Sequence, residues 1–255
     1  MFTPSDHLFQ IMLISWIVLA VIIFTVLLFV SAPYGRHLRK GWGLNLSNRM
    51  GWMIMEAPSA ILMLVYFFTG GRQNNIVLLT FLILWEIHYL HRTFIFPLRF
   101  HSSKRDMPFL VVLMAIFFNT ANTYFNGLYL FHFSPDYLVR WLYDWRFIAG
   151  SVIFISGFAI NQHSDHILFT LRKPGETGYK IPYGGTYRWI SCPNYLGEVL
   201  EWTGWALATW SLAGVSFAVW TFANLVPRAI ANHTWYKHQF PAYPKERKAV
   251  IPFVL

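Results

Sequence analysis

Residues 8–30 form an uncharged and almost wholly apolar run, LFQIMLISWIVLAVIIFTVLLFV. A helix rises about 1.5 Å per residue, so a run of this length crosses a bilayer core of roughly 30 Å. No basic segment precedes the run, and it exceeds the usual apolar core of a signal peptide. We therefore predict a membrane helix rather than a cleaved leader.

Apolar stretches of similar length recur along the rest of the chain. They lie at 51–69, 76–98, 107–131 and 147–169, and a longer stretch at 195–225 predicts two helices, near 195–211 and 214–238, with a turn around 211–214. We therefore predict an all-α, multi-pass integral membrane protein with seven transmembrane helices. Residues 1–255 are expected to form a single membrane domain.

The composition excludes several other classes of protein. Hydrophobic residues make up 56% and charged residues 12% of the chain, against about 25% charged residues in a soluble domain. This composition rules out a disordered chain and a coiled coil, and it argues against an ordinary soluble enzyme. The single cysteine, Cys192, cannot form an internal disulfide or a multi-cysteine zinc site.

The net charge of +9 predicts an orientation in the membrane. Seven spans would place the loops at 32–50, 99–106 and 170–193 and the tail after 236 on one face. These segments hold 15 of the 20 Lys and Arg residues, and the opposite face holds 3. Basic loops stay in the cytoplasm, so we expect the N-terminus outside and the C-terminus in the cytoplasm. A bacterial inner membrane and an endoplasmic reticulum both remain open, and we expect no nucleic-acid partner.

Polar residues inside the predicted spans follow helical spacing. A charge at mid-membrane costs about 2.5–3.5 kcal/mol and normally faces a cavity or a partner. Polar residues three or four positions apart share a helix face, and the sets are Asn161 and Asp165; Asn194, Glu198 and Glu201; Asn224, Arg228, Asn232 and Tyr236; and Glu86, Tyr89 and Arg92. They could brace contacts between helices or line a solvated pocket. Their recurrence on several helices favours the pocket.

Two other features leave the ligand undecided. The histidine pairs His88–His91 and His163–His166 each share a helix face, but no two histidines are adjacent, and we expect no metal site. The loop at 170–193 combines basic residues, tyrosines and the Gly184–Gly185 pair. Such a loop could bind phosphate groups of a nucleotide or touch anionic lipid headgroups.

Several longer segments resemble the steroid 5α-reductase family. They are INQHSDHILFTLRKPGETGYKIPYGG at 160–185, PNYLGEVLEWTGWALATWSL at 193–212, YPKERKAVIPF at 243–253, HYLHRTFIF at 88–96 and MEAPS at 55–59. The resemblance extends from about residue 45 to Leu255. Trans-2-enoyl-CoA reductases and polyprenol reductases share the C-terminal pattern more loosely, and HYLHRTF and MEAPS favour the steroid branch.

The resemblance implies an NADPH-dependent reductase whose seven helices enclose a cofactor and steroid cavity. Such an enzyme saturates the Δ4 double bond of a 3-oxo-Δ4-steroid, with hydride added to C5. Residues 1–100 would contribute the steroid side of the pocket and residues 101–255 the NADPH site. Glu56 and Tyr89 map onto the pair that binds the 3-keto oxygen. Glu56 could act as a protonated donor or as a carboxylate that orients Tyr89.

The resemblance also implies a set of cofactor residues. They are Asn161, Asp165, Arg172, Tyr179, Asn194, Glu198, Arg228 and Tyr236, with Arg92, Lys104 and Arg105 as further candidates and Asn232 with less weight, because some relatives have histidine there. Met55 departs from the family, which commonly has glutamine before the glutamate. The expected partners are a 3-oxo-Δ4-steroid and membrane lipids, with no obligate protein partner.

Three other functions remain open from the sequence. The first is reduction of another enone or enoyl lipid, of the enoyl-CoA or polyprenol type. Isoprenylcysteine carboxyl methyltransferases have a related C-terminal membrane core that binds an adenosine cofactor, but they have no reason to keep MEAPS and HYLHRTF. A non-enzymatic membrane protein that binds a lipid or sterol is the third alternative.

Overall fold

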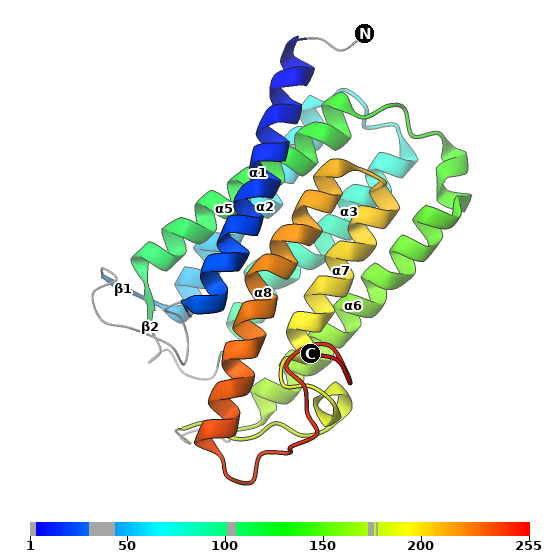
Figure 1. Ribbon diagram of the computed structural model, residues 1–255. Helices are drawn as coiled ribbons and strands as arrows, with labels where there is room; N and C mark the ends of the chain where they lie inside the picture. The colour runs from blue at the N-terminus through cyan, green and yellow to red at the C-terminus, as the bar shows by residue number, and fades with distance from the viewer. Residues whose placement is uncertain (1–3, 31–43, 101–105, 173–175, 177) are drawn as a thin grey trace. The chain divides into compact units, whose positions relative to one another are not determined.

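The computed structural model describes residues 4–30, 44–100, 106–172, 176 and 178–255, and it is mostly helical. The chain divides into two compact units. The first unit comprises Met1–His7 and Pro33–Phe147, and the second comprises Leu8–Ala32 and Ile148–Leu255. The predicted apolar stretches are helical over nearly all of their length (Figure 1).

The first unit is built on three main helices. Its elements are β1 (Asn45–Ser47), α2 (Asn48–Thr69), α3 (Ile76–Leu90), the π-helical segment η2 (His91–Ile95), α4 (Phe96–Leu98), β2 (Asp106–Pro108), α5 (Phe109–Leu128), the π-helical segment η3 (Tyr129–Phe133) and the 3-10 helix η4 (Val139–Tyr143). Ser47 and Asn75 cap α2 and α3 by accepting hydrogen bonds from backbone N–H groups of the first turn. Helices α2 and α5 pack against each other.

The structure adds two features to the all-α prediction for this unit. Strands β1 and β2 pair antiparallel over three residues each, which is too short for the alternation by which a strand is recognised. The predicted span at 76–98 is also not uniform, because η2 interrupts its α-helical geometry at His91. A π-turn changes the angular spacing of side chains, so residues after Leu90 no longer follow the α-helical face.

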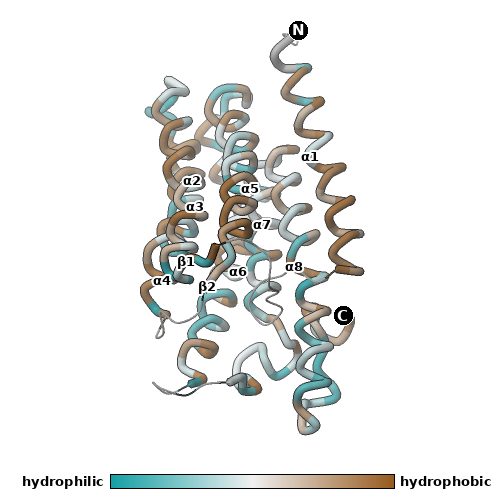
Figure 2. The backbone as a smooth tube through the Cα atoms, turned by 90° about the vertical axis from the view of Figure 1, so that its left-hand side faces the viewer, coloured by the Kyte–Doolittle hydropathy of each residue, from teal (hydrophilic) through white to brown (hydrophobic). Residues whose placement is uncertain are grey.

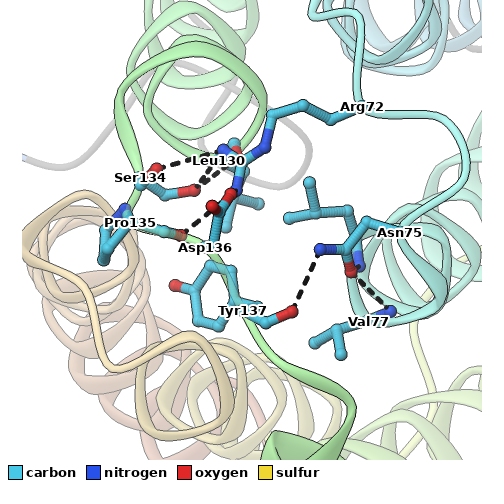
Figure 3. Close-up of polar contacts among 9 residues, drawn as sticks. Arg72, Asn75, Val77, Leu130, Ser134, Pro135, Asp136 and Tyr137 are labelled. Atoms are coloured by element: carbon cyan, nitrogen blue, oxygen red, sulfur yellow. Dashed lines mark hydrogen bonds and ion pairs between the residues drawn. The ribbon is translucent and has the colours of Figure 1, made fainter.

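Arg72 ties the turn after α2 to the segment after α5 (Figure 3). Its guanidinium donates to the backbone oxygens of Ser134 and Pro135, at 3.0 and 3.2 Å, and to Asp136 Oδ1 at 2.9 Å. Asn75, at the start of α3, donates from Nδ2 to Tyr137 O at 3.0 Å. The planar guanidinium of Arg72 presents five donors in a fixed fork. The side chain of Arg72 therefore connects the turn after α2 to the segment that follows η3.

The second unit contains the remaining helices. They are α1 (Pro4–Phe29), which belongs to this unit from Leu8 on, α6 (Trp145–Thr170), which belongs to it from Ile148 on, the 3-10 helix η5 (Gly185–Arg188), α7 (Pro193–Thr209) and α8 (Leu212–Gln239). The predicted division of 195–238 into two helices is confirmed. The turn falls at Trp210, which has a left-handed φ of 45°, and at Ser211, whose hydroxyl accepts from Gly214 N. Figure 1 shows α7 and α8 side by side.

Helices α6 and α7 meet backbone to backbone at glycines. A Cβ at Gly157 would lie 2.4 Å from Glu201 N and 2.5 Å from Gly197 O, and a Cβ at Gly197 would lie 2.6 Å from Asn161 N. The same contact recurs seven residues away on each helix, at Gly150 and Gly204. Any side chain at these positions would force the two backbones apart, so the helices approach closely only because glycine is present.

Three helical stretches among the described residues are long and apolar enough to cross a bilayer, namely His7–Phe29, Asn48–Thr69 and Phe109–Phe133. Helix α1 is hydrophobic along most of its length (Figure 2) and exposes many of its apolar side chains. Contact of such a surface with lipid has no hydrophobic cost, whereas contact with water has one. Helix α7 has 17 residues, at the short end of what a span needs, and α3 continues through η2 and α4 to Leu98. The count of seven spans stays a prediction.

The glycine contact between α6 and α7 yields the first test. Gly157→Ala should destabilise the protein, because overpacking a tight contact costs about 1–3 kcal/mol. Ala159→Val adds bulk to the same helix at an exposed position and should change the melting temperature little. Thermal unfolding of the purified protein measures both variants, and equal melting temperatures would contradict the packing argument.

Candidate functional site

The polar centre of the first unit is built around Glu56 on α2. The side chain of Glu56 is 12% exposed, and its Oε2 accepts a hydrogen bond from Asn119 Nδ2 at 3.1 Å. The same amide nitrogen donates to Met55 O at 2.6 Å. Pro58 stands two residues further along α2 and removes a backbone donor from the helix. Asn119 of the neighbouring helix α5 therefore holds Glu56, at a turn of α2 where Pro58 leaves one backbone hydrogen bond unmade.

Arg92 brings a cation to the same carboxyl group. Its Nε lies 4.0 Å from Glu56 Oε1, and its guanidinium carbon lies 4.4 Å from the ring centres of both Trp52 and Phe96. Cations are attracted to the faces of aromatic rings, so the two rings fix the position of the guanidinium. Arg92 lies in the π-helical segment η2, which sets the direction of its side chain.

Tyr89 is buried on α3, with 2% of its surface exposed. Its ring contacts those of Trp85 and His88, at centroid distances of 4.8 and 4.9 Å. Glu86, one turn earlier, is also buried, and neither of its carboxylate oxygens has a hydrogen-bond partner within the described part of the chain. A buried polar group without a partner is costly, so this face of α3 is suited to meet a ligand or water.

In the second unit, the polar stripes predicted on two helices face each other. Asn161 Nδ2 on α6 donates to Asn194 O at 3.0 Å and to Glu198 Oε1 at 3.3 Å on α7. Asn194 Nδ2 donates back to Asp165 Oδ1 at 3.1 Å. Gly157 lies about one turn before Asn161 on α6, and Gly197 lies about one turn after Asn194 on α7. The close approach of the helices at these glycines therefore brings the four polar side chains within hydrogen-bond distance.

The predicted stripe on α8 extends toward the C-terminal tail. Tyr236 stacks on Tyr243 with the ring centres 5.2 Å apart. Arg228 lies over the ring of Tyr195 at 5.6 Å, and Asn232 Nδ2 lies 3.8 Å from Cys192 Sγ.

The loop at 170–193 contributes the other described cofactor candidates. Arg172 donates to Gly178 O at 3.1 Å, and the ring of Tyr179 lies 4.9 Å from that of Trp235 on α8. Burial, with a further contribution from the negative charge of Asp165, raises the pKa of Tyr187 well above its usual value. The Tyr187 hydroxyl therefore stays protonated near neutral pH. Lys104 and Arg105 lie outside the described residues.

Arg247 in the tail was not among the site residues predicted from the sequence. Arg247 is 3% exposed and lies 4.9 Å from the ring centre of Tyr183 and 5.3 Å from that of Tyr243. Its Nε and Nη1 atoms have no acceptor among the residues that the structure describes. A buried guanidinium without an acceptor is unfavourable, and an anionic group such as a phosphate would satisfy it. The available cue was the concentration of basic and aromatic residues at 235–248.

Asn119 was also not among the site residues predicted from the sequence. Four polar residues of α5 are buried at helical spacing, namely Asn119, Asn122, Thr123 and Asn126. This i, i+3, i+4, i+7 pattern inside an apolar stretch was visible in the sequence. Met55 replaces the glutamine that the family resemblance implies, and an amide from α5 contacts Glu56.

Comparisons with known proteins agree on one family. Residues 105–255 match the family model described as 3-oxo-5-alpha-steroid 4-dehydrogenase. The chain is 44% identical over 235 residues to steroid 5-alpha-reductase DET2 of Arabidopsis thaliana, covering 90% of each protein. It is 43% identical over 244 residues to 3-oxo-5-alpha-steroid 4-dehydrogenase 1 of Bos taurus, covering 93% of each. Similarity of this extent, over nearly the whole of both relatives, shows that the chain belongs to the 3-oxo-5-alpha-steroid 4-dehydrogenase family, the steroid 5α-reductases.

Proposed function

We propose that this membrane protein reduces the Δ4 double bond of 3-oxo-Δ4-steroids to give 5α-reduced 3-oxosteroids, with NADPH as the reductant. The observation that carries the proposal is the near full-length similarity to relatives named for this reaction. The burial of the Tyr89 hydroxyl-bearing side chain and of most of Glu56 supports it, because an enone oxygen needs donors in an apolar pocket.

Glu56 and Tyr89 would bind the 3-keto oxygen. When bound, the reduced nicotinamide supplies the hydride that adds to C5, the β-carbon of the enone. Negative charge then grows on the C3 oxygen, and a hydroxyl aimed at that oxygen stabilises the transition state. A proton reaches C4 to complete the reduction. Tyr89 is the donor in this scheme, and Glu56 either donates beside it or orients its hydroxyl.

The residues assigned to the cofactor by resemblance would hold NADPH, and those that the structure describes lie in the second unit, except for Arg92. Asn161, Asp165, Asn194 and Glu198 supply amide and carboxylate groups suited to a carboxamide and ribose hydroxyls. Arg172 and Arg228, with Arg92, Lys104 and Arg105, supply cations suited to phosphates. Tyr179, Tyr236 and Asn232 complete the set. Two guanidinium atoms of Arg247 have no acceptor among the residues that the structure describes, which supports an anionic ligand in this unit.

The proposed function is tested by incubating the purified protein with testosterone or progesterone and NADPH. Loss of enone absorbance and formation of the 5α product are expected. Tyr89→Phe should lower turnover by about 10²- to 10³-fold, as expected for removal of one oxyanion donor. Tyr66→Phe is a matched control, since Tyr66 lies in the same unit and its ring contacts Tyr124 and His132.

The behaviour of Glu56→Gln distinguishes the two roles of Glu56. The glutamine keeps a donor but cannot ionise, so activity should persist if the protonated acid is the working form. Activity should be lost if a carboxylate orients Tyr89. Full activity in both Tyr89→Phe and Glu56→Ala would show that the carbonyl is polarised elsewhere.

We expect the protein to select NADPH over NADH through cations near the 2′-phosphate. Replacing the responsible residue among Arg172, Lys104 and Arg105 by alanine removes a charge-assisted hydrogen bond, which should weaken NADPH binding by about 10- to 150-fold. NADH binding should barely change. Titration of nicotinamide fluorescence measures both dissociation constants. Lys180→Ala serves as a control, because Lys180 is an exposed cation of the same loop that pairs with Glu176. Equal losses for both cofactors at all three positions would reject the assignment.

The seven-span topology proposed from the charge distribution places the C-terminus in the cytoplasm, where NADPH is available. A reporter that works only in the cytoplasm should therefore be active when it is fused after Leu255. Absence of that activity would overturn both the topology and the route of the cofactor.

A further inference from the structure

The amide of Asn119 is fixed between two acceptors. Asn119 is 5% exposed on α5, and its Nδ2 lies 2.6 Å from Met55 O and 3.1 Å from Glu56 Oε2. A side-chain amide nitrogen has two hydrogens to donate, whereas its oxygen can only accept. Because a backbone carbonyl also only accepts, the nitrogen must face α2, and each of its hydrogens has one partner.

This arrangement makes the two oxygens of Glu56 unequal. Oε2 accepts from Asn119, so it cannot carry a proton that points at that amide. The other oxygen, Oε1, lies 4.0 Å from Arg92 Nε. The two oxygens of Glu56 therefore meet different groups, the amide of Asn119 at Oε2 and the side of Arg92 at Oε1.

We propose that Asn119 is a positioning residue, which clamps Glu56 against the backbone of α2 and orients its carboxyl group for the carbonyl end of the substrate. This inference rests on the proposed function of Glu56. A free glutamate side chain has three rotatable torsions and loses more conformational freedom when ordered than most residues. The clamp restricts those torsions before the substrate arrives, and such preorganisation lowers the barrier rather than tightening substrate binding.

A second hydrogen bond between the same helices provides a matched control. Thr123, one turn further along α5, is fully buried and donates to Ser59 Oγ on α2 at 3.2 Å. Thr123→Val removes that bond at nearly constant volume and leaves Glu56 and Asn119 intact. If Asn119 only braced α5 on α2, variants at Asn119 and Thr123 would have the same effects.

The test compares Asn119→Leu, Asn119→Asp and Thr123→Val as purified full-length proteins with testosterone and NADPH. Both Asn119 variants should lower kcat by about 10- to 150-fold, the range for loss of a hydrogen bond to a charged group, with little change in steroid KM. Asn119→Asp should also shift the pH profile of kcat, because it sets a second carboxyl group beside Glu56. Thr123→Val should keep kcat and its pH profile.

NADPH affinity, measured by fluorescence, should match wild type in all three variants and serves as the check of folding. Asn119→Asp is nearly isosteric, so it remains informative if the leucine variant fails to fold.

A double-mutant cycle separates this inference from the assignment on which it rests. In a Glu56→Ala background, Asn119→Leu should cause no further loss of kcat, because its effect acts through Glu56. An undiminished further loss, or wild-type kcat in the Asn119→Asp single variant, would overturn the positioning role. Full activity of Glu56→Ala by itself would instead overturn the catalytic assignment of Glu56.

Discussion

The close contact between α6 and α7 at Gly157 and Gly197 is the constraint on which the polar network of the second unit depends. Each glycine lies where any side chain would overlap the backbone of the partner helix. At this separation Asn161 reaches both Asn194 and Glu198. Longer side chains at the glycines would not only destabilise the helix pair; they would also break the hydrogen bonds that orient the groups proposed to hold the cofactor.

The first unit fixes its central carboxyl group by a different means. Around Glu56, buried amide and aromatic side chains reach across from neighbouring elements. Asn119 holds one oxygen of Glu56, and Trp52 and Phe96 fix Arg92 near the other. In an apolar interior a polar group must find its partner within the protein. The same requirement that stabilises the helix contacts therefore orients the groups of the proposed site.

Much of the candidate site could be predicted from the sequence. Spacing placed Asn161 with Asp165 and Asn194 with Glu198 on single helix faces, and the structure brings these faces together. The comparisons establish the steroid 5α-reductase family that the motifs resembled, which favours a reductase over a methyltransferase or a binding protein. Asn119 and Arg247 were not predicted as site residues, because nothing at their own positions in the sequence indicates what each side chain contacts. Only the fold shows that one contacts Glu56 and the other is buried.

The sequence by itself determined that the chain is a mostly helical membrane protein, where its main helices lie, and to which family it belongs. These properties depend on local apolar runs and on short motifs, which are readable residue by residue. The tertiary structure decided which polar groups meet. That outcome depends on the rotation and separation of helices distant in sequence, and these are set by the π-helical segment at His91–Ile95, the paired glycines of α6 and α7, and the contact of α5 with α2. Side chains on one helix specify its buried face, but the partner of each buried polar atom follows only from packing.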